Sequence, residues 1–325
     1  MKQKILSVVV PTYNMEAYLP RCLDSVTRED VPDTLEVIVV NDGSKDRSLE
    51  IAKEYQAKRP DIISIIDKSN GHYGSCINAA LKVATGKYFR PLDADDWFDT
   101  NALIEFLKEL ENSNADLVLT AFKCYRPTKL VTQKPIGVQY NTEYTPDDKK
   151  IWQKQTSIFM SMQATTFKLE VLKASHLKLS EGICYSDSEF VFYPLKNTKK
   201  SIFLNLCLYN YDLSRDGQSM NPAVAAKNHS QSALIIEKIL SNQNTFSALE
   251  RKMFCSCLMS YYYRMLFLCK DDKELRKIDK ALRNVNMGLW NLLNKSLANT
   301  PLLWRIFGIH FFWYEPLKRF FHIDR

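Results

Sequence analysis

The chain has 325 residues, of which 46% are hydrophobic and 25% charged, a composition that favours a globular protein over a disordered one. It contains no stretch of about 18 apolar residues, which predicts that no helix spans a membrane. The net charge of +7 is unevenly distributed, because residues 1–220 hold 28 basic and 29 acidic side chains whereas residues 221–325 hold 16 and 8. We therefore expect a change of character near residue 220.

The sequence lacks the signatures of several common protein classes. Eight cysteines are scattered without a CxxC pair, and we interpret them as reduced core residues of a cytoplasmic protein. The turn at residues 11–18 (PTYNMEAY) has no glycine that would admit a pyrophosphate, and no P-loop is present, which argues against dehydrogenases, kinases and ATPases. The basic residues follow no groove-reading motif, so we expect no nucleic acid partner.

Apolar runs alternate with amphipathic stretches over the first 125 residues. Runs at 6–10, 35–40, 62–66, 88–92 and 117–122 predict buried strands, and the stretches between them carry the apolar spacing of helices. This alternation predicts an α/β fold with a mainly parallel sheet and helices on both faces. The loops after the first, second and fourth strands then lie along one edge of the sheet, where such folds bind their ligands.

The remainder of the chain is less regular. Residues 126–150 give no clear element beyond a helix start near Thr145. Apolar runs at 162–167, 202–206 and 208–211 predict further strands. From about residue 222 the apolar spacing becomes helical, so we expect a helical and basic C-terminal region over residues 221–325.

Three carboxylates, Asp93, Asp95 and Asp96, follow the fourth predicted strand within four positions. Carboxylates this close repel one another unless a cation compensates them, and hard divalent cations prefer oxygen ligands. One interpretation is therefore a Mg²⁺ or Mn²⁺ site. The other is a turn that leads into a helix, with aspartates capping free backbone N–H groups.

Three segments, SVVVPTYNMEAYL, EVIVVNDGSKDRS and NGHYGSCINAALKVATGKYFRPLDADDWF, resemble the family 2 glycosyltransferases. The motifs occur in the family's order and spacing over residues 5–125, and the similarity is weaker from 126 to 220. The resemblance implies an A-type nucleotide-sugar-binding fold. It also implies a catalytic domain over 1–220, with a donor half at 1–125 and an acceptor half at 126–220.

The resemblance implies a nucleotide-binding role for four residues. Pro11, Tyr13 and Asn14, after the first strand, would line the base. Asp42, after the second strand, would accept a hydrogen bond from the base, as a carboxylate does from the imide N–H of uracil.

The resemblance also implies residues around the donor's phosphates and sugar. Asn70 and Gly71 would border the donor pocket. Asp93 and Asp95 would form the family's D-x-D motif, with Asp93 near the ribose and Asp95 holding the Mn²⁺ or Mg²⁺ ion that bridges the two phosphates. Asp96 is a third candidate ligand for that ion.

The motif SDSEF at 186–190 resembles the family's acidic motif near the acceptor, although a serine stands where a glutamate is usual. Asp187 would then be the general base that takes the proton of the acceptor hydroxyl. Arg215 would stabilise the departing phosphates, with Gln218 and Ser219 nearby. The alternatives are a helix N-cap for Asp187 and a surface ion pair with the neighbouring aspartate for Arg215.

The segment 301–321 is dense in aromatic and basic residues, which suits a helix lying on an anionic membrane surface. It equally suits a terminal helix docked on its own domain or on a second copy of the chain, in a homo-oligomer. With the resemblance, membrane contact favours a location on the inner face of the cell membrane.

We therefore predict an inverting, metal-dependent glycosyltransferase. Its donor would be a nucleotide sugar, UDP-linked, and its acceptor a polysaccharide or a lipid-linked oligosaccharide. The alternatives are a non-catalytic protein that binds sugar nucleotides or glycans, and a nucleotidyltransferase, although the glycine- and lysine-rich triphosphate loop of the latter is missing.

Overall fold

The computed structural model describes residues 3–156, 159, 161–214, 218, 224, 227–241, 246–267, 272–285, 288, 290–291, 300–307 and 310. Its contacts divide the chain into two compact units, Met1–Asp212 and Leu213–Arg325, and each unit is described by itself.

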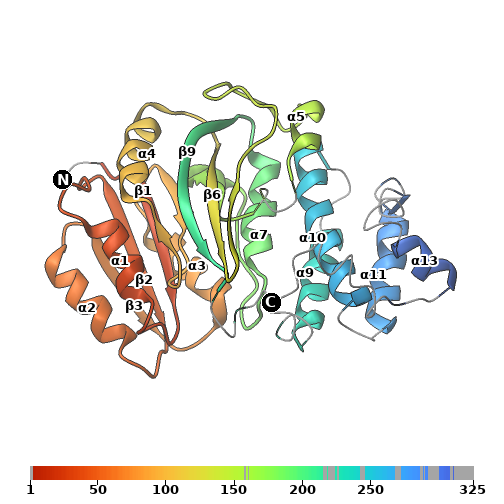
Figure 1. Ribbon diagram of the computed structural model, residues 1–325, viewed down its shortest axis with the longest axis horizontal. Coiled ribbons are helices and arrows are strands. Elements are labelled where there is room, and N and C mark those ends of the chain that lie inside the picture. Colours follow the sequence, from red (N-terminus) through yellow and green to blue (C-terminus); the bar gives the residue numbers. More distant parts are fainter. Residues whose placement is uncertain are drawn as a thin grey trace. The chain divides into compact units, whose positions relative to one another are not determined.

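The first unit is built on a nine-stranded sheet in the order β3-β2-β1-β4-β8-β6-β9-β5, with β7 paired to β6 (Figure 1). Its N-terminal strands are all parallel: β1 (Leu6–Thr12), β2 (Leu35–Asp42), β3 (Ile63–Lys68) and β4 (Tyr88–Pro91). β1 and β2 are buried along almost their whole length because helices cover both faces, which explains their continuous apolar runs.

The direction in which the chain moves along the sheet determines which face each helix of this half covers. The chain moves outward from β1 to β3 through α1 (Leu19–Thr27) and α2 (Ser48–Lys58), then returns through α3 (His72–Val83) to β4 on the other side of β1. Right-handed crossovers place α1 and α2 on one face and α3 on the opposite face. The sheet therefore has a topological switch point between β1 and β4, where open α/β sheets bind ligands.

The second half of the sheet is mixed. β8 (Thr165–Lys168) lies antiparallel between β4 and β6 (Leu117–Arg126), and β9 (Ser201–Asp212) runs parallel to β6. β5 (Trp97–Phe98) is antiparallel to β9, and β7 (Lys129–Gln133) forms a hairpin with β6. The predicted α/β class is confirmed. The parallel pairing expected for most of the sheet is limited to its N-terminal half and the β6–β9 pair, because the antiparallel β8 is inserted between β4 and β6.

The sheet curls on itself at the predicted metal loop. β4 is fourth in the strand order and β5 is at the far edge, yet only residues 92–96 separate them in the chain. Five residues span at most about 20 Å, so the far edge must bend back toward β4. We call residues 92–96 the aspartate loop, and it bridges the two sides of this curl.

A buried arginine lies inside the curl. Arg90 of β4 is fully buried, and its guanidinium donates to Thr166 Oγ1 at 2.8 Å, to Thr120 Oγ1 at 3.3 Å and to the carbonyl oxygen of Gln163. These bonds connect β4 to β6 and to the start of β8. Burial lowers the pKa of Arg90 to about 9, so the side chain still carries its charge at neutral pH.

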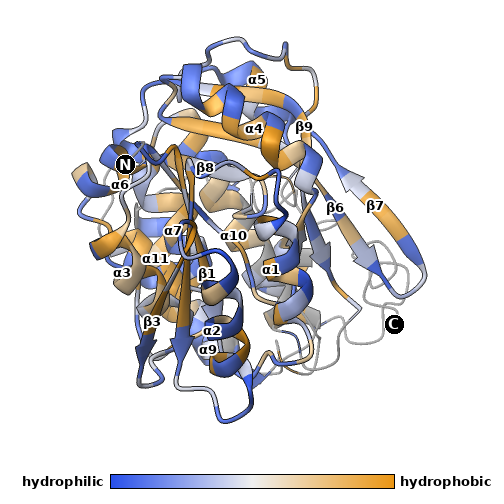
Figure 2. Cartoon of the chain, turned by 90° about the vertical axis from the view of Figure 1, so that its left-hand side faces the viewer, coloured by the Kyte–Doolittle hydropathy of each residue, from blue (hydrophilic) through white to orange (hydrophobic). Residues whose placement is uncertain are grey.

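The first unit contains further helices after β4. They are α4 (Thr100–Asn112), α5 (Lys149–Lys154), α6 (Leu169–Ala174), α7 (Asp187–Phe192) and the 3₁₀ turn η1 (Tyr193–Asn197). Hydrophobic residues follow central strands such as β1, whereas α2 is largely hydrophilic (Figure 2).

The described part of the second unit is helical, as the sequence predicts: α9 (His229–Ser241), α10 (Ala248–Phe267), α11 (Asp272–Val285) and α13 (Thr300–Phe307). α11 buries Leu275, Ile278 and Leu282, and α13 packs on α10 with Trp304 only 2% exposed. Among the described residues no helix combines the length and the apolarity that crossing a bilayer requires. Residues 308, 309 and 311–325 of the predicted membrane-contacting tail lie outside the described residues.

An ion pair joins α13 to α11. Arg305 Nε donates to Asp279 Oδ1 at 2.8 Å, and the two side chains are 8% and 14% exposed. Trp290 Nε1 donates to the other oxygen of Asp279 at 2.9 Å, and the Tyr262 hydroxyl donates to the same carboxylate. The first helix of the tail is therefore docked on its own unit.

Arg305→Gln is expected to lower the free energy of unfolding by about 3 kcal/mol, because it leaves the carboxylate of Asp279 buried without its cation. The matched control is Lys277→Gln, which breaks the ion pair between Lys277 and Glu237. Because the Lys277 side chain is 68% exposed, this substitution should lower the free energy of unfolding by less than about 1 kcal/mol. Urea denaturation followed by tryptophan fluorescence measures both. Equal losses would contradict the structural role of the buried pair.

Candidate active site

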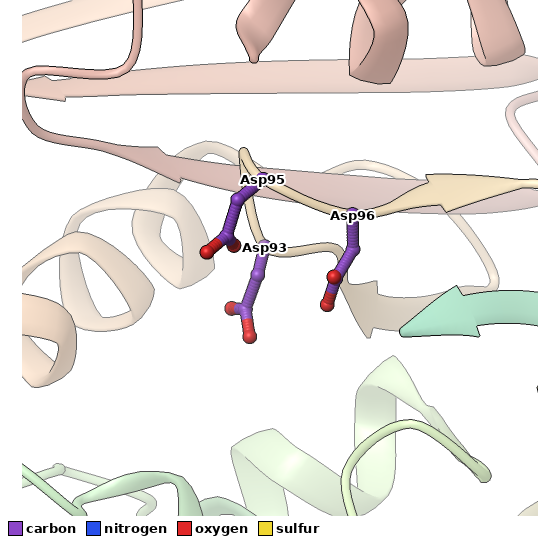
Figure 3. A group of neighbouring side chains, drawn as sticks. All are labelled: Asp93, Asp95 and Asp96. Carbon is purple, nitrogen blue, oxygen red and sulfur yellow. The ribbon is translucent and has the colours of Figure 1, made fainter. Parts of the chain in front are cut away.

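The three aspartates of the aspartate loop meet after β4. Their carboxylate oxygens include a set that lies within 4.8 Å of one another, and all three side chains extend from the same side of the loop (Figure 3). The Asp96 N–H donates to the carbonyl oxygen of Asp93 at 2.9 Å, which closes the turn. Asp93 and Asp95 are partly exposed, whereas Asp96 is fully buried.

The electrostatics of the loop fit a divalent cation. Burial, followed by the negative charges of Asp95 and Asp93, raises the pKa of Asp96 well above its usual range. A cluster that offers only carboxylate oxygens matches the preference of Mg²⁺ and Mn²⁺. The alternative, that this cluster caps a helix, is wrong for the described contacts, because Asp99 caps α4 by accepting from the Ala102 N–H at 3.1 Å.

The loop is held by residues distant in the sequence. The Tyr209 hydroxyl donates to Asp96 Oδ2 at 2.6 Å, and the Asp212 N–H donates to Asp96 Oδ1 at 2.7 Å. Arg21 of α1 donates to the Asp95 carbonyl oxygen at 2.7 Å and to Asp212 Oδ2 at 2.8 Å. Sequence reasoning missed these contacts, since no local pattern marks them.

Asp42 lies at the end of β2 and is 2% exposed. Its Oδ1 accepts from Lys68 Nζ at 2.6 Å, from the Gly71 N–H at 3.0 Å and from Ser75 Oγ at 3.4 Å. Its Oδ2 accepts none of the hydrogen bonds found among the described residues, so it keeps its capacity for one more donor. The predicted pocket residue Asn70 is exposed in the same β3–α3 loop as Gly71.

The loop after β1 reaches the same edge of the sheet. Pro11 is the penultimate residue of β1, and Tyr13 is 46% exposed. Asn14 adopts a φ of 53°, its N–H donates to Ser44 Oγ at 3.1 Å, and its Oδ1 accepts from the Lys45 N–H at 2.7 Å. The side chain of Asn14 thus ties the β1 loop to the β2 loop and brings Tyr13 and Asp42 to one edge.

Asp187 is the first residue of α7 and is partly exposed, and the N-cap position belongs to Ser186. The cap interpretation of Asp187 is therefore wrong. Burial and then the charges of Asp93 and Asp187 raise the pKa of Tyr73 well above its usual value. Burial and then the charges of Asp96, Asp93 and Asp187 likewise raise the pKa of Tyr211 well above its usual value. Phe190 of α7 packs against Phe89 of β4 with ring centroids 6.1 Å apart, so α7 lies beside the strand that leads into the aspartate loop.

The segment before α7 is fixed by polar contacts that sequence reasoning also missed. Glu189 accepts from the Ser180 N–H at 2.6 Å and from Ser180 Oγ at 3.0 Å, so this carboxylate braces the segment. Asn78 of α3 donates to the Leu179 carbonyl oxygen at 3.0 Å and accepts from the Leu179 N–H at 2.9 Å. A Cβ on Gly74 would lie 2.1 Å from the Ser180 carbonyl oxygen, which explains the glycine there.

The other predicted site residues follow β9. Arg215 and Ser219 lie outside the described residues. Gln218 is described but belongs to the second unit, so the three remain predictions.

Comparisons with known proteins agree with the resemblance. The pattern of the family described as Glycosyl transferase family 2 matches residues 7–174. The uncharacterized glycosyltransferase EpsJ of Bacillus subtilis is 29% identical over 64% of this chain and 60% of its own length. The uncharacterized glycosyltransferase MG060 homolog of Mycoplasma pneumoniae is 31% identical over 66% of this chain and 71% of its own length.

TarS of Staphylococcus aureus, a poly(ribitol-phosphate) beta-N-acetylglucosaminyltransferase, is 26% identical over 67% of this chain and 37% of its own length. The crystal structure of TarS 1–349 in complex with UDP-GlcNAc superposes with a TM-score of 0.70 at 21% identity, covering 92% of this chain and 86% of that one. The sequence matches thus cover 60% of the length of EpsJ and 37% of the length of TarS, less than two thirds of each. The family pattern covers more than half of the chain, and the chain belongs to glycosyltransferase family 2.

Proposed function

We propose that this chain transfers a sugar from a UDP-linked donor to a hydroxyl group of a cell-envelope polysaccharide or a lipid-linked oligosaccharide, with inversion at the anomeric carbon. One geometric observation carries the proposal. The ends of β1, β2 and β4 bring Tyr13, Asp42 and the aspartate loop to one edge of the sheet, and α7, which begins at Asp187, packs on β4 through Phe190 and Phe89.

The nucleotide end of the donor is assigned to the β1 and β2 loops. Asp42 Oδ2 has acceptor capacity left, and the imide N–H of uracil is a donor that suits a carboxylate. Tyr13 offers an exposed ring to the base, and Pro11 and Asn14 set the course of its loop. Asn70 and Gly71 border this pocket. The complex of TarS with UDP-GlcNAc supports a UDP-linked donor.

The phosphate end of the donor is assigned to the aspartate loop. Asp93 and Asp95 would hold a Mn²⁺ or Mg²⁺ ion, and Asp96 completes the carboxylate cluster. Such an ion, when bound, neutralises the charge that builds on the departing diphosphate. Arg215 would add positive charge there, with Gln218 and Ser219 beside it.

Asp187 is assigned as the general base. Its carboxylate would accept the proton of the acceptor hydroxyl while that oxygen attacks the anomeric carbon and the nucleoside diphosphate departs from the opposite face. A single displacement of this kind inverts the anomeric configuration.

The acceptor assignment rests on the relatives and on charge. TarS acts on poly(ribitol-phosphate), and we place the acceptor of this chain in the same class of extended envelope polymers. The basic excess of residues 221–325 favours attachment to the anionic inner face of the cell membrane. Vesicle flotation checks the attachment: binding to anionic but not neutral vesicles, weakened by salt, supports it, and equal recovery with both contradicts it.

The test of the function is UDP release from a panel of nucleotide sugars with Mn²⁺, with Mg²⁺ and with EDTA. We expect slow, metal-dependent release from one sugar in the absence of acceptor, since water can replace the acceptor hydroxyl. The anomeric configuration of the released sugar, read by NMR before it equilibrates, checks inversion. The proposal would be contradicted if no nucleotide sugar released UDP and none bound to the protein in calorimetry.

A further inference from the structure

We propose that Asp96 is not a ligand of the metal but the anchor of the aspartate loop, and that Tyr209 is the positioning residue that holds it. This inference rests on the proposed function, since it divides the roles of the three aspartates in the same site. Asp93 and Asp95 are left as the protein's metal ligands.

Asp96 is already occupied by the protein. One of its oxygens accepts from the Tyr209 hydroxyl at 2.6 Å and the other from the Asp212 N–H at 2.7 Å. The residue has no exposed surface, whereas Asp93 and Asp95 are partly exposed. A carboxylate whose two oxygens both face protein donors in the interior contributes charge and position rather than an open coordination site.

The Tyr209 hydroxyl touches both ends of the aspartate loop. Besides donating to Asp96, it accepts from the Asp93 N–H at 3.2 Å. Its ring is fully buried, with an edge contact to Phe98 at 5.7 Å and the Arg90 guanidinium 5.8 Å away. Packing therefore fixes the hydroxyl, and the hydroxyl fixes the spacing between Asp93 and Asp96.

Arg21 supports the loop from α1. Its guanidinium donates to the Asp95 carbonyl oxygen and to the Asp212 carboxylate, and it stacks on Trp97 at 3.9 Å. The backbone of the loop is thus held at Asp93, Asp95 and Asp96. Like charges would otherwise spread apart in the metal-free protein, so this framework keeps Asp93 and Asp95 close enough to share one ion.

The test is Mn²⁺ binding to the full chain in the presence of UDP, measured from the EPR signal of free Mn²⁺. Tyr209→Phe and Asp96→Asn are each expected to raise the Mn²⁺ dissociation constant about tenfold while binding remains saturable. Asp95→Asn is expected to abolish saturable binding. If one anchor is shared, the double variant Tyr209→Phe/Asp96→Asn binds no more weakly than the weaker single variant.

The matched control is Tyr88→Phe. Tyr88 lies at the other end of β4, is fully buried, and has its hydroxyl 3.0 Å from the carbonyl oxygens of Ser113 and Ala115. Its loss should destabilise the fold about as much as Tyr209→Phe, yet leave the Mn²⁺ dissociation constant within about twofold of the wild type. Thermal unfolding in EDTA reports the two stability losses.

The outcomes separate this inference from the proposed function. Loss of binding in Asp96→Asn as complete as in Asp95→Asn would make Asp96 a ligand and overturn the anchor. If Tyr209→Phe binds Mn²⁺ with the wild-type dissociation constant, the Tyr209 hydroxyl has only a packing role, and its positioning role is overturned. A wild-type protein that binds neither Mn²⁺ nor UDP would instead overturn the proposed function, and the anchor with it.

Discussion

Asp187→Asn is expected to lower the rate of sugar transfer by about 10³-fold, because the amide cannot accept the proton of the acceptor hydroxyl. The substitution keeps the size of the side chain, and the N-cap position of α7 belongs to Ser186 rather than to Asp187, so the fold should be unaffected. Binding of the nucleotide sugar should also persist, since the donor is held by other loops. Initial rates of UDP release, with donor binding by calorimetry, measure both quantities.

The matched control for Asp187→Asn is Glu181→Gln. Glu181 is an exposed carboxylate of the preceding segment that accepts from Asn78 Nδ2 at 2.8 Å. We expect close to wild-type rates from it. A chain that keeps its turnover with Asn at 187 would require another base, and transfer in that variant with retention of configuration would contradict the single displacement.

Asp95→Asn is expected to reduce metal-dependent turnover by about 10³-fold, because loss of a charged ligand removes several kcal/mol of stabilisation of the departing diphosphate. The turnover of Asp95→Asn should not recover at high Mn²⁺, whereas that of the anchor variants Tyr209→Phe and Asp96→Asn should. Rates measured from micromolar to millimolar Mn²⁺ distinguish the two. Glu105→Gln, on the exposed surface of α4, controls for the loss of one negative charge. Full rescue of Asp95→Asn by Mn²⁺ would contradict its role as a ligand.

The donor edge of the fold could be predicted from the sequence. Buried parallel strands appear in the sequence as continuous apolar runs. The loops that follow such strands lie at the same edge of the sheet, whatever residues the loops contain. This is why Asp42 and the aspartate loop could be assigned to one edge. Local patterns could not choose between a metal site and a helix cap for the cluster, and the tertiary structure removed the cap by placing β5 before α4 and Asp99 at its start.

The framework around the site could not be predicted, because its contacts join residues that no local spacing relates. Tyr209 and Asp96 are 113 residues apart, and Arg21 and Asp212 are 191 apart. Their meeting depends on the insertion of β8 between β4 and β6 and on the return of β9 and β5 to the aspartate loop. The sequence by itself determined which chemical groups the protein offers and at which edge. Only the tertiary structure decided which carboxylate is fully buried and which are partly exposed, because strand order and curl are set by packing between distant segments.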